Sequence, residues 1–229
     1  MGFNNGLFKS SVVRKNVMAV TGLFTVFFLI IHLAGNLILI LPDSMFPIEF
    51  WGNVANQHDM YNAYSHFLVH FWPITIVAWV LYAGLAIHVI DALLITLANN
   101  KAKGEKYAKT DNSTSTWYSR NMGLLGVAIL AFIIMHMGQF WLKYKVLGTE
   151  EDLYVLVNKT FGVLWIVIVY EIGIIALGLH MLHGIESAHR SLGFYKPRIM
   201  KMAKYLALCL SIMMTVLYGI IPLIMYLQQ

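Results

Sequence analysis

The chain alternates between long apolar stretches and short polar segments. Five apolar stretches exceed the about 20 helical residues that cross a hydrocarbon core of ~30 Å, at roughly 17–42, 67–98, 118–146, 161–192 and 203–227. Apolar residues cover most faces of each stretch, as they do on lipid-embedded helices. The pattern therefore predicts an all-α integral membrane protein, a single domain over 1–229 built as a bundle of five transmembrane helices.

Composition agrees with this interpretation. The 229 residues are 59% hydrophobic and 12% charged, with a mean hydropathy of +0.68, whereas a soluble domain carries about 25% charged residues. A soluble globule, a disordered chain and a nucleic-acid-binding protein are therefore excluded, despite the net charge of +5. The single cysteine, Cys209, also excludes an internal disulfide, a Cys-ligated iron–sulfur cluster and a covalently attached c-type haem.

The basic residues predict the orientation of the chain. All but three of the 16 Lys and Arg residues lie before the first span, between the second and third, or between the fourth and fifth. The exceptions are Lys143, Lys145 and Lys159. The positive-inside rule places the basic side, with the N-terminus, in the cytoplasm and the C-terminus outside.

Four histidines lie inside the apolar stretches, one in each of the first four: His32, His88, His136 and His180. Counting from the flanking charges at 1.5 Å per residue puts His32 and His136 at an outer level. The same count puts His88 and His180 at an inner level, with ~5–10 Å between the levels along the membrane normal.

Two histidines that face each other across a bundle supply the two axial ligands of a six-coordinate b-type haem. Four histidines on four helices at two heights therefore predict two stacked haems. One intramembrane histidine alone is more often a helix–helix hydrogen-bond partner, and the joint pattern carries the haem hypothesis. Glycines near the histidines would let a flat macrocycle approach the backbone, namely Gly35, Gly84, Gly138 and Gly184.

The fourth span offers two histidines on nearly one face, His180 and His183, because they are three residues apart. His180 is closer in depth to His88, whereas His183 is nearer the headgroups. We expect His180 to be the ligand and His183 to hydrogen-bond a haem propionate, a water or a neighbouring helix.

Several segments resemble a known family. They are Ser11–Gly22 (SVVRKNVMAVTG), Ile31–Asn36 (IHLAGN), Ile87–Asp91 (IHVID), Ser119–Arg120, and Gly178–Gly184 (GLHMLHG) running into Ser187 and Ala188. In this order, with one histidine per helix, the chain resembles the di-haem cytochrome b subunit of succinate dehydrogenases and fumarate reductases (complex II). The match is to the single-chain, five-helix, b558-like type and covers almost the whole chain.

The resemblance implies a membrane anchor for a flavoprotein (FAD) subunit and an iron–sulfur subunit in the bacterial cytoplasmic membrane. Such a chain binds no dicarboxylate itself. It passes electrons through two haem b groups between the iron–sulfur subunit and a membrane quinone, usually menaquinone, in the respiratory chain and the tricarboxylic acid cycle. In the family the second and fourth helices hold the inner haem and the first and third the outer, which matches the pairing from depth.

Two further family features bear on the fourth span. The family's ligand there is followed four residues later by glycine, which corresponds to His180 with Gly184. Some members carry a glutamate two residues before that ligand, associated with proton movement, and here the position is Gly178. Glu171 lies on the same span at a position that does not match, so a proton path through it is a separate hypothesis.

Polar residues at the inner mouth of the bundle are candidates for contacts with the propionates of the inner haem, because carboxylates at a membrane boundary favour such partners. The candidates are Arg14, Ser119, Arg120, His183 and Arg190. The positive-inside bias alone explains the presence of any single basic residue here.

A quinone site needs a carboxylate or an imidazole that can exchange protons, and the resemblance favours the outer side. The candidates there are Glu49 and His66, with His58, Asp59 and His70 as further choices. Solvated-loop chemistry is the alternative for each.

Two other functions fit the same pattern. One is a di-haem cytochrome b anchor of another quinone-linked complex, of the hydrogenase or formate dehydrogenase type. The other is a haem-free proton channel or transporter that uses Glu171 and the membrane histidines, since a charged group at mid-bilayer costs several kcal/mol and is functional by default.

Overall fold

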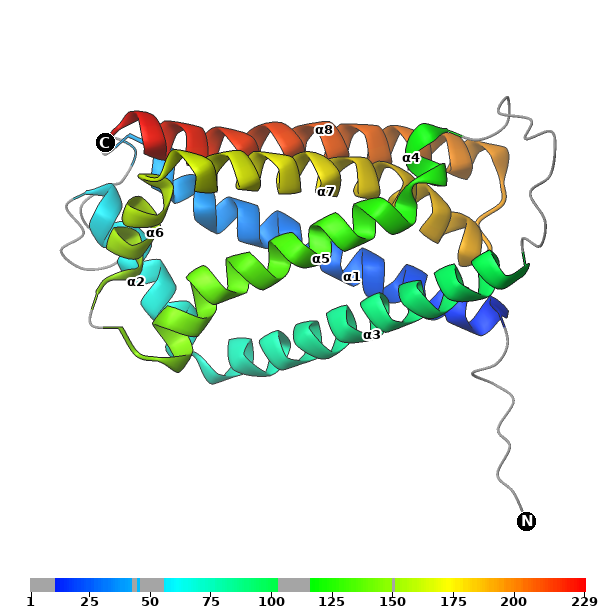
Figure 1. The fold of residues 1–229 in the computed structure, drawn as a ribbon, viewed down its shortest axis with the longest axis horizontal. Coiled ribbons are helices and arrows are strands. Elements are labelled where there is room, and N and C mark those ends of the chain that lie inside the picture. Colours follow the sequence, from blue (N-terminus) through cyan, green and yellow to red (C-terminus); the bar gives the residue numbers. More distant parts are fainter. Residues whose placement is uncertain (1–10, 43–44, 46–55, 103–115, 150) are drawn as a thin grey trace, which may run out of the picture.

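The computed structural model describes residues 11–42, 45, 56–102, 116–149 and 151–229, and within these ranges it contains helices and no strands (Figure 1). The α-helices in chain order are α1 (Ser11–Leu37), α2 (Gln57–His70), α3 (Trp72–Ala102), α4 (Trp117–Arg120), α5 (Met122–Gln139), α6 (Leu153–Phe161), α7 (Leu164–Ser191) and α8 (Pro197–Leu227). A short 3₁₀ segment, Ile38–Ile40, continues α1, and a π-helical turn, Leu142–Val146, follows α5.

Five helices are long and apolar enough to cross a membrane: α1, α3, α5, α7 and α8. The prediction of an all-α bundle with five spans is therefore confirmed, and the chain is a multi-pass membrane protein. The three remaining helices of the described chain are short, and α2 and α6 lie at the end of the bundle opposite to the start of α1 (Figure 1).

Helix boundaries differ from the predicted spans where proline intervenes. The stretch 67–98 is divided, because the backbone of Phe71 is extended (φ −80°, ψ 104°) and ends α2. Pro73 is the second residue of α3, where its missing N–H is not needed. Pro197 likewise begins α8, before the predicted 203–227. The stretch 118–146 is divided as well, into α4, α5 and the π-helical turn, without a proline. The spans 17–42 and 161–192 differ from α1 and α7 by a few residues at their ends.

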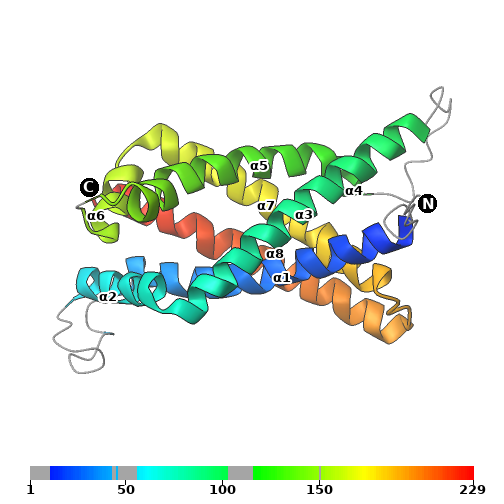
Figure 2. The same cartoon turned by 90° about the horizontal axis from the view of Figure 1, so that it is seen from below.

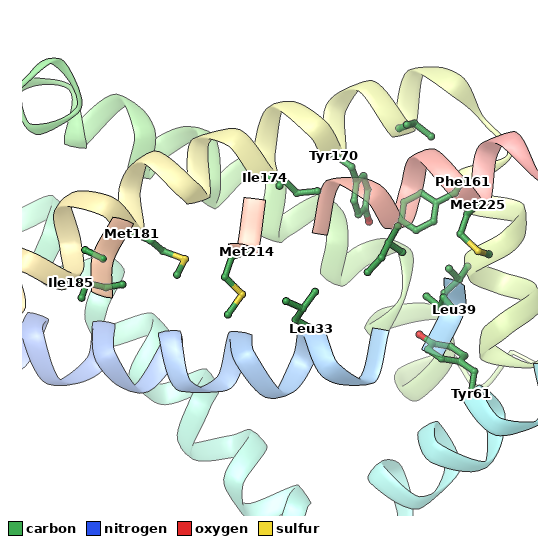
Figure 3. Close-up of a cluster of buried hydrophobic side chains, with 14 residues drawn as sticks. Leu33, Leu39, Tyr61, Phe161, Tyr170, Ile174, Met181, Ile185, Met214 and Met225 are labelled. Carbon is green, nitrogen blue, oxygen red and sulfur yellow. The ribbon is translucent and has the colours of Figure 1, made fainter. Parts of the chain in front are cut away.

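The central helices are α1 and α7, and α8 packs against both along one edge of the bundle, most extensively against α7 (Figures 1 and 2). Figure 3 shows the core between them, where Leu33, Ile174 and Met214 are buried. In contrast, α3 packs mainly on α1, α5 packs mainly on α7, and both present many exposed apolar side chains. These surfaces suit contact with lipid.

One close approach between helices depends on a missing side chain. A Cβ at Gly173 of α7 would lie 2.6 Å from Cγ and 3.0 Å from Cβ of Phe132 on α5. Glycine thus lets the Phe132 ring lie directly against the backbone of α7, as small residues do at membrane helix interfaces.

We expect Gly173→Ala to destabilise the α5–α7 contact by about 1–3 kcal/mol, because Phe132 is held near its own Cβ and has little room to move. The apparent thermal midpoint in detergent should fall. Gly123→Ala is the matched control, since the added Cβ would meet Thr96 at an ordinary 3.7 Å. An unchanged midpoint for Gly173→Ala would contradict this packing.

The predicted orientation is testable with reporter fusions. The start of α1 and the α7–α8 turn lie at one end of the bundle, and the C-terminal residue Gln229 lies at the other end (Figure 1). Alkaline phosphatase fused after Gln229 should be active and a fluorescent protein there dark, while fusions at Gly193 should give the opposite pattern. Fluorescence from the fusion at Gln229 would reverse the topology.

Candidate functional site

His32 of α1 and His136 of α5 form an outer pair of facing imidazoles. Their ring centres are 5.8 Å apart and their planes are nearly perpendicular, at 88°. Phe28 stacks on His32 from the preceding turn of α1, with ring centres 5.2 Å apart. The outer pair therefore lies in an aromatic environment with its rings turned toward each other.

Hydrogen bonds around His136 come from α7 and α5. The Oη atom of Tyr170 lies 3.4 Å from Nδ1 of His136 and donates to Oε1 of Gln139 at 2.7 Å. The His32 ring has weaker hydrogen-bond contacts. The Asn36 amide donates to the His32 backbone carbonyl at 2.8 Å and lies 3.4 Å from both ring nitrogens, so it points well at neither nitrogen.

His88 of α3 and His180 of α7 form an inner pair. Their ring centres are 6.2 Å apart, with 69° between the planes. Nδ1 of His88 lies 3.2 Å from the hydroxyl of Thr21 on α1. Nδ1 of His180 is buried and has no hydrogen-bond partner among the described residues.

The ring spacing distinguishes ways of joining two imidazoles. With a metal–nitrogen bond of about 2.0 Å and the ring centre about 1.2 Å behind the nitrogen, two imidazoles on opposite sides of one metal ion would have centres roughly 6.4 Å apart. A direct N–H···N hydrogen bond of about 2.9 Å would bring the centres to roughly 5.3 Å. The inner pair, at 6.2 Å, is close to the first spacing, and the outer pair, at 5.8 Å, lies between the two. Among the described hydrogen bonds none joins the two rings of a pair.

The pairing of the rings is the one that the depth argument predicts, and ligation of haem iron stays a prediction. The levels are separated along both central helices. On α1, Gly22 lies against His88 and His32 follows ten residues later; on α7, Tyr170 contacts His136 and His180 follows ten residues later. This separation is about 15 Å measured along the helices. The expected ~5–10 Å refers to the membrane normal and stays a prediction.

The glycines expected near a macrocycle have different surroundings. A Cβ at Gly138 or Gly184 would meet nothing within 4 Å, and one at Gly84 would meet only Phe24, at 3.8 Å. Gly35 differs, because a Cβ there would lie 2.4 Å from the ring of Tyr64 on α2. The expectation that Gly35 faces a macrocycle is wrong, since a tyrosine from outside the membrane spans fills that space.

The two histidines of α7 separate as expected from their depths. His180 faces His88, whereas the ring centre of His183 lies 6.3 Å from that of Tyr118 on α4. His183 thus contacts a neighbouring helix, and its role toward a propionate stays a prediction.

The polar candidates at the inner mouth of the bundle interact with neighbouring residues of this chain. Arg190 forms an ion pair with Glu186 one turn earlier on α7. Ser119 lies in α4, where its backbone N–H donates to the Thr116 hydroxyl at 3.4 Å. Arg14 in the first turn of α1 and Arg120 at the end of α4 also interact with neighbouring groups.

The quinone candidates at the outer end are not brought to the outer pair. Glu49 lies outside the described residues. His66 and His70 stack with ring centres 3.9 Å apart on the exposed face of α2, opposite the buried Tyr61 and Ser65.

The two further candidates from the same stretch serve the ends of helices. His58 approaches Asp152 at 3.7 Å, beside α6. The backbone N–H of Asp59 donates to the Asn56 side chain that caps α2. The first contact joins α2 to the start of α6, and the second caps α2 alone. Tyr61 is buried on α2, and this burial raises its pKa.

A hollow on the outer side involves residues that the sequence did not single out. It has a volume of about 260 Å³ and is lined by Gln139, Lys143, Glu151, Leu156, Lys159, Thr160 and Ile166. Lys159 and Glu151 form an ion pair across it. Gln139 connects it to the outer pair through Tyr170.

Thr21, Gln139 and Tyr170 are the polar neighbours of the histidines that sequence reasoning missed. Thr21 lies in one of the family-like segments, and Tyr170 directly precedes the membrane glutamate. Thr21 contacts His88 and Tyr170 contacts His136 across two different helices. Their positions in the sequence therefore show no regular spacing to these histidines.

Glu171 of α7 points toward α8. A Cβ at Gly219 would lie 2.9 Å from Oε2 of Glu171, and its Oε1 atom is buried without a hydrogen-bond partner among the described groups. The carboxyl group therefore lies at the α7–α8 interface and depends on the small residue opposite.

Within the described residues, no cluster of three or more His, Cys, Asp or Glu side chains is arranged to hold a metal ion. Each histidine pair contains two side chains, so the absence of larger clusters among these residues does not bear on it. Comparison of the chain with protein-family models, curated proteins and solved structures gave no match.

Proposed function

We propose that this chain is the membrane anchor and electron-transfer subunit of a succinate:quinone oxidoreductase, carrying two haem b groups. His88 and His180 would hold the inner haem, and His32 and His136 the outer. The observation that carries the proposal is the presence of two imidazole pairs across the bundle, with ring centres 5.8 Å and 6.2 Å apart, each of which would offer two nitrogen ligands to one haem iron.

The surroundings of the inner pair suit a flat macrocycle. Nδ1 of His180 is buried without a hydrogen-bond partner among the described residues, and the backbone is open beside Gly184, which lies one turn from His180 on the same face of α7. A bound haem b supplies a one-electron redox couple whose potential the protein sets through its ligands and their hydrogen bonds. The chain's own residues orient the imidazoles, keep water out with aromatic side chains and confine the two pairs to different levels.

The partners would dock at the end that carries the start of α1, α4 and the α7–α8 turn. This end lies nearer the inner pair and holds the basic residues Arg14, Arg120 and Arg190. By resemblance, an iron–sulfur subunit and an FAD-containing subunit would bind there, on the cytoplasmic side of a bacterial membrane. The chain's role as an enzyme is therefore that of a subunit that binds no dicarboxylate.

A second hollow of about 440 Å³ is lined by Ala63, His66, Phe67, His70 and Phe71. For the quinone we favour the smaller hollow at Gln139, because Tyr170 connects it to His136 of the outer pair. Its volume of about 260 Å³ is close to the ~300 Å³ lower bound for ligand sites, which suits a ring headgroup with the tail left in lipid. Gln139 and Lys143 provide donors, and Tyr170 links the hollow to His136. Menaquinone is the expected quinone.

A haem-free proton channel is the second candidate, because the Oε1 atom of Glu171 is buried and unpartnered among the described residues. A membrane carboxyl group without a partner is a functional candidate in its own right. Haem content separates this function from the first.

A haem assay on single histidine variants tests the proposal. The purified wild-type chain should give reduced b-type bands and about two haems per chain by pyridine haemochrome. Alanine at any of the four paired histidines should remove one haem, because the remaining imidazole cannot fill both axial positions.

His183→Ala and His66→Ala are the controls for this assay and should keep wild-type haem content. Full haem content in His180→Ala together with loss in His183→Ala would reassign the ligand on α7. A colourless wild-type chain would contradict the proposal and leave the proton-channel alternative.

The open space beside the glycines gives a second test. Gly184→Leu adds a side chain where the protein has no atoms within 4 Å of a Cβ, so the polypeptide alone should tolerate it. If a macrocycle fills that space, haem content should fall by about one per chain while the fold, judged by gel filtration and circular dichroism, is retained. Gly123→Leu, on the exposed start of α5, should keep both haems.

A further inference from the structure

One histidine of each pair contacts a hydroxyl group on a third helix. His88, which pairs with His180, contacts Thr21 of α1; His136, which pairs with His32, contacts Tyr170 of α7. A hydroxyl has one proton to donate and two lone pairs that accept. Where that one proton is donated therefore decides which imidazole nitrogen carries a hydrogen.

The proton of Thr21 is used by its own helix. Its Oγ1 atom lies 2.8 Å from the carbonyl oxygen of Val17 and 3.2 Å from that of Met18, and carbonyl oxygens can only accept. Toward His88 the hydroxyl is then left with a lone pair. The 3.2 Å contact is a hydrogen bond only if Nδ1 of His88 carries the proton, which leaves Nε2 bare.

Gly22 keeps the His88 ring in this position. A Cβ at residue 22 would lie 3.1 Å from Cε1 and 3.6 Å from Nδ1 of His88, so the ring rests directly on the backbone of α1 beside Thr21. The hydrogen bond and the close approach together fix the ring's distance from α1 and its rotation.

Tyr170 follows the same logic at the outer pair. Its Oη atom donates to Oε1 of Gln139 at a short 2.7 Å, so the lone pairs of Oη face Nδ1 of His136 at 3.4 Å. The other histidine of each pair lacks such an acceptor: Nδ1 of His180 has no partner, and His32 is approached by an amide donor of Asn36.

We propose that Thr21 and Tyr170 are positioning residues that hold the proton of His88 and His136 on Nδ1, so that Nε2 of each faces its partner ring as a free donor atom. Thr21 serves the inner pair and Tyr170 the outer. The inference deepens the proposed function and rests on it only in naming haem iron as the atom that these nitrogens face. An acceptor on Nδ1–H raises the basicity of a ligating imidazole, and hydrogen bonds of this kind tune haem potentials.

The test is a redox titration of the purified full chain, with haem content measured in parallel. Thr21→Val keeps the shape and removes the hydroxyl acceptor, while the backbone of Met18, which also hydrogen-bonds His88, stays in place. One of the two haem potentials should become more positive while haem content is retained. Tyr170→Phe should shift the other potential in the same direction. Thr21→Ser restores the hydroxyl and should return the wild-type value.

Two matched controls separate the effect from general loss of a buried hydroxyl. Thr25 donates to the Thr21 carbonyl one turn along α1, and Tyr218 donates to the Leu29 carbonyl beside His32. Thr25→Val and Tyr218→Phe should leave both potentials in place. Unchanged potentials in Thr21→Val and Tyr170→Phe, a shift of the same haem by both, or a negative shift would overturn the inference.

A readout without haem keeps the inference separate from the proposed function. In the haem-free chain labelled with ¹⁵N-histidine, the ring nitrogen shifts of His88 and His136 should report the Nδ1–H tautomer. Finding the Nε2–H tautomer at both would overturn the inference even if the protein binds two haems. A wild-type chain that has the Nδ1–H tautomer at both histidines and binds no haem would instead overturn the proposed function alone. This measurement also decides the matter if Thr21→Val does not fold.

Discussion

The arrangement of this bundle depends on the cost of placing imidazoles in a hydrocarbon environment. A polar ring among lipid-facing helices must find partners inside the protein, because the membrane core offers none. Here the rings lie against each other in two pairs, and one ring of each pair contacts a hydroxyl group on a third helix. The helices α1 and α7 each contribute to both levels, which explains why they occupy the centre while α3 and α5 flank them.

Much of the fold could be predicted because membrane spans are a local property of the sequence. Length and apolar composition give the five long helices, and the helical rise gives the order of the histidines in depth. Proline shifts the boundaries in ways that composition does not reveal, as at Pro73 and Pro197. The site was therefore predictable at the level of which rings meet.

The parts of the site that the sequence did not reveal are those set by contacts between helices. The space beside Gly35 depends on where α2 folds back, and Tyr64 from that helix occupies it. The exposed position of His66 depends on which face α2 buries, which a short helix of mixed polarity does not indicate. Thr21 and Tyr170 are ordinary residues on their own helices and acquire a role only through the histidine opposite.

The distance between the two levels has an electrical consequence. A separation of about 15 Å along the helices corresponds to at most about half of a hydrocarbon core of ~30 Å thickness, because helix tilt shortens it along the membrane normal. Under the proposed function, an electron that moves from one level to the other crosses that share of the transmembrane voltage. A full crossing involves about 2.3 kcal/mol per 100 mV for one elementary charge, so this partial crossing involves at most about 1.1 kcal/mol per 100 mV. The direction in which the complex runs would then depend on membrane energisation, in addition to the affinities of its substrates.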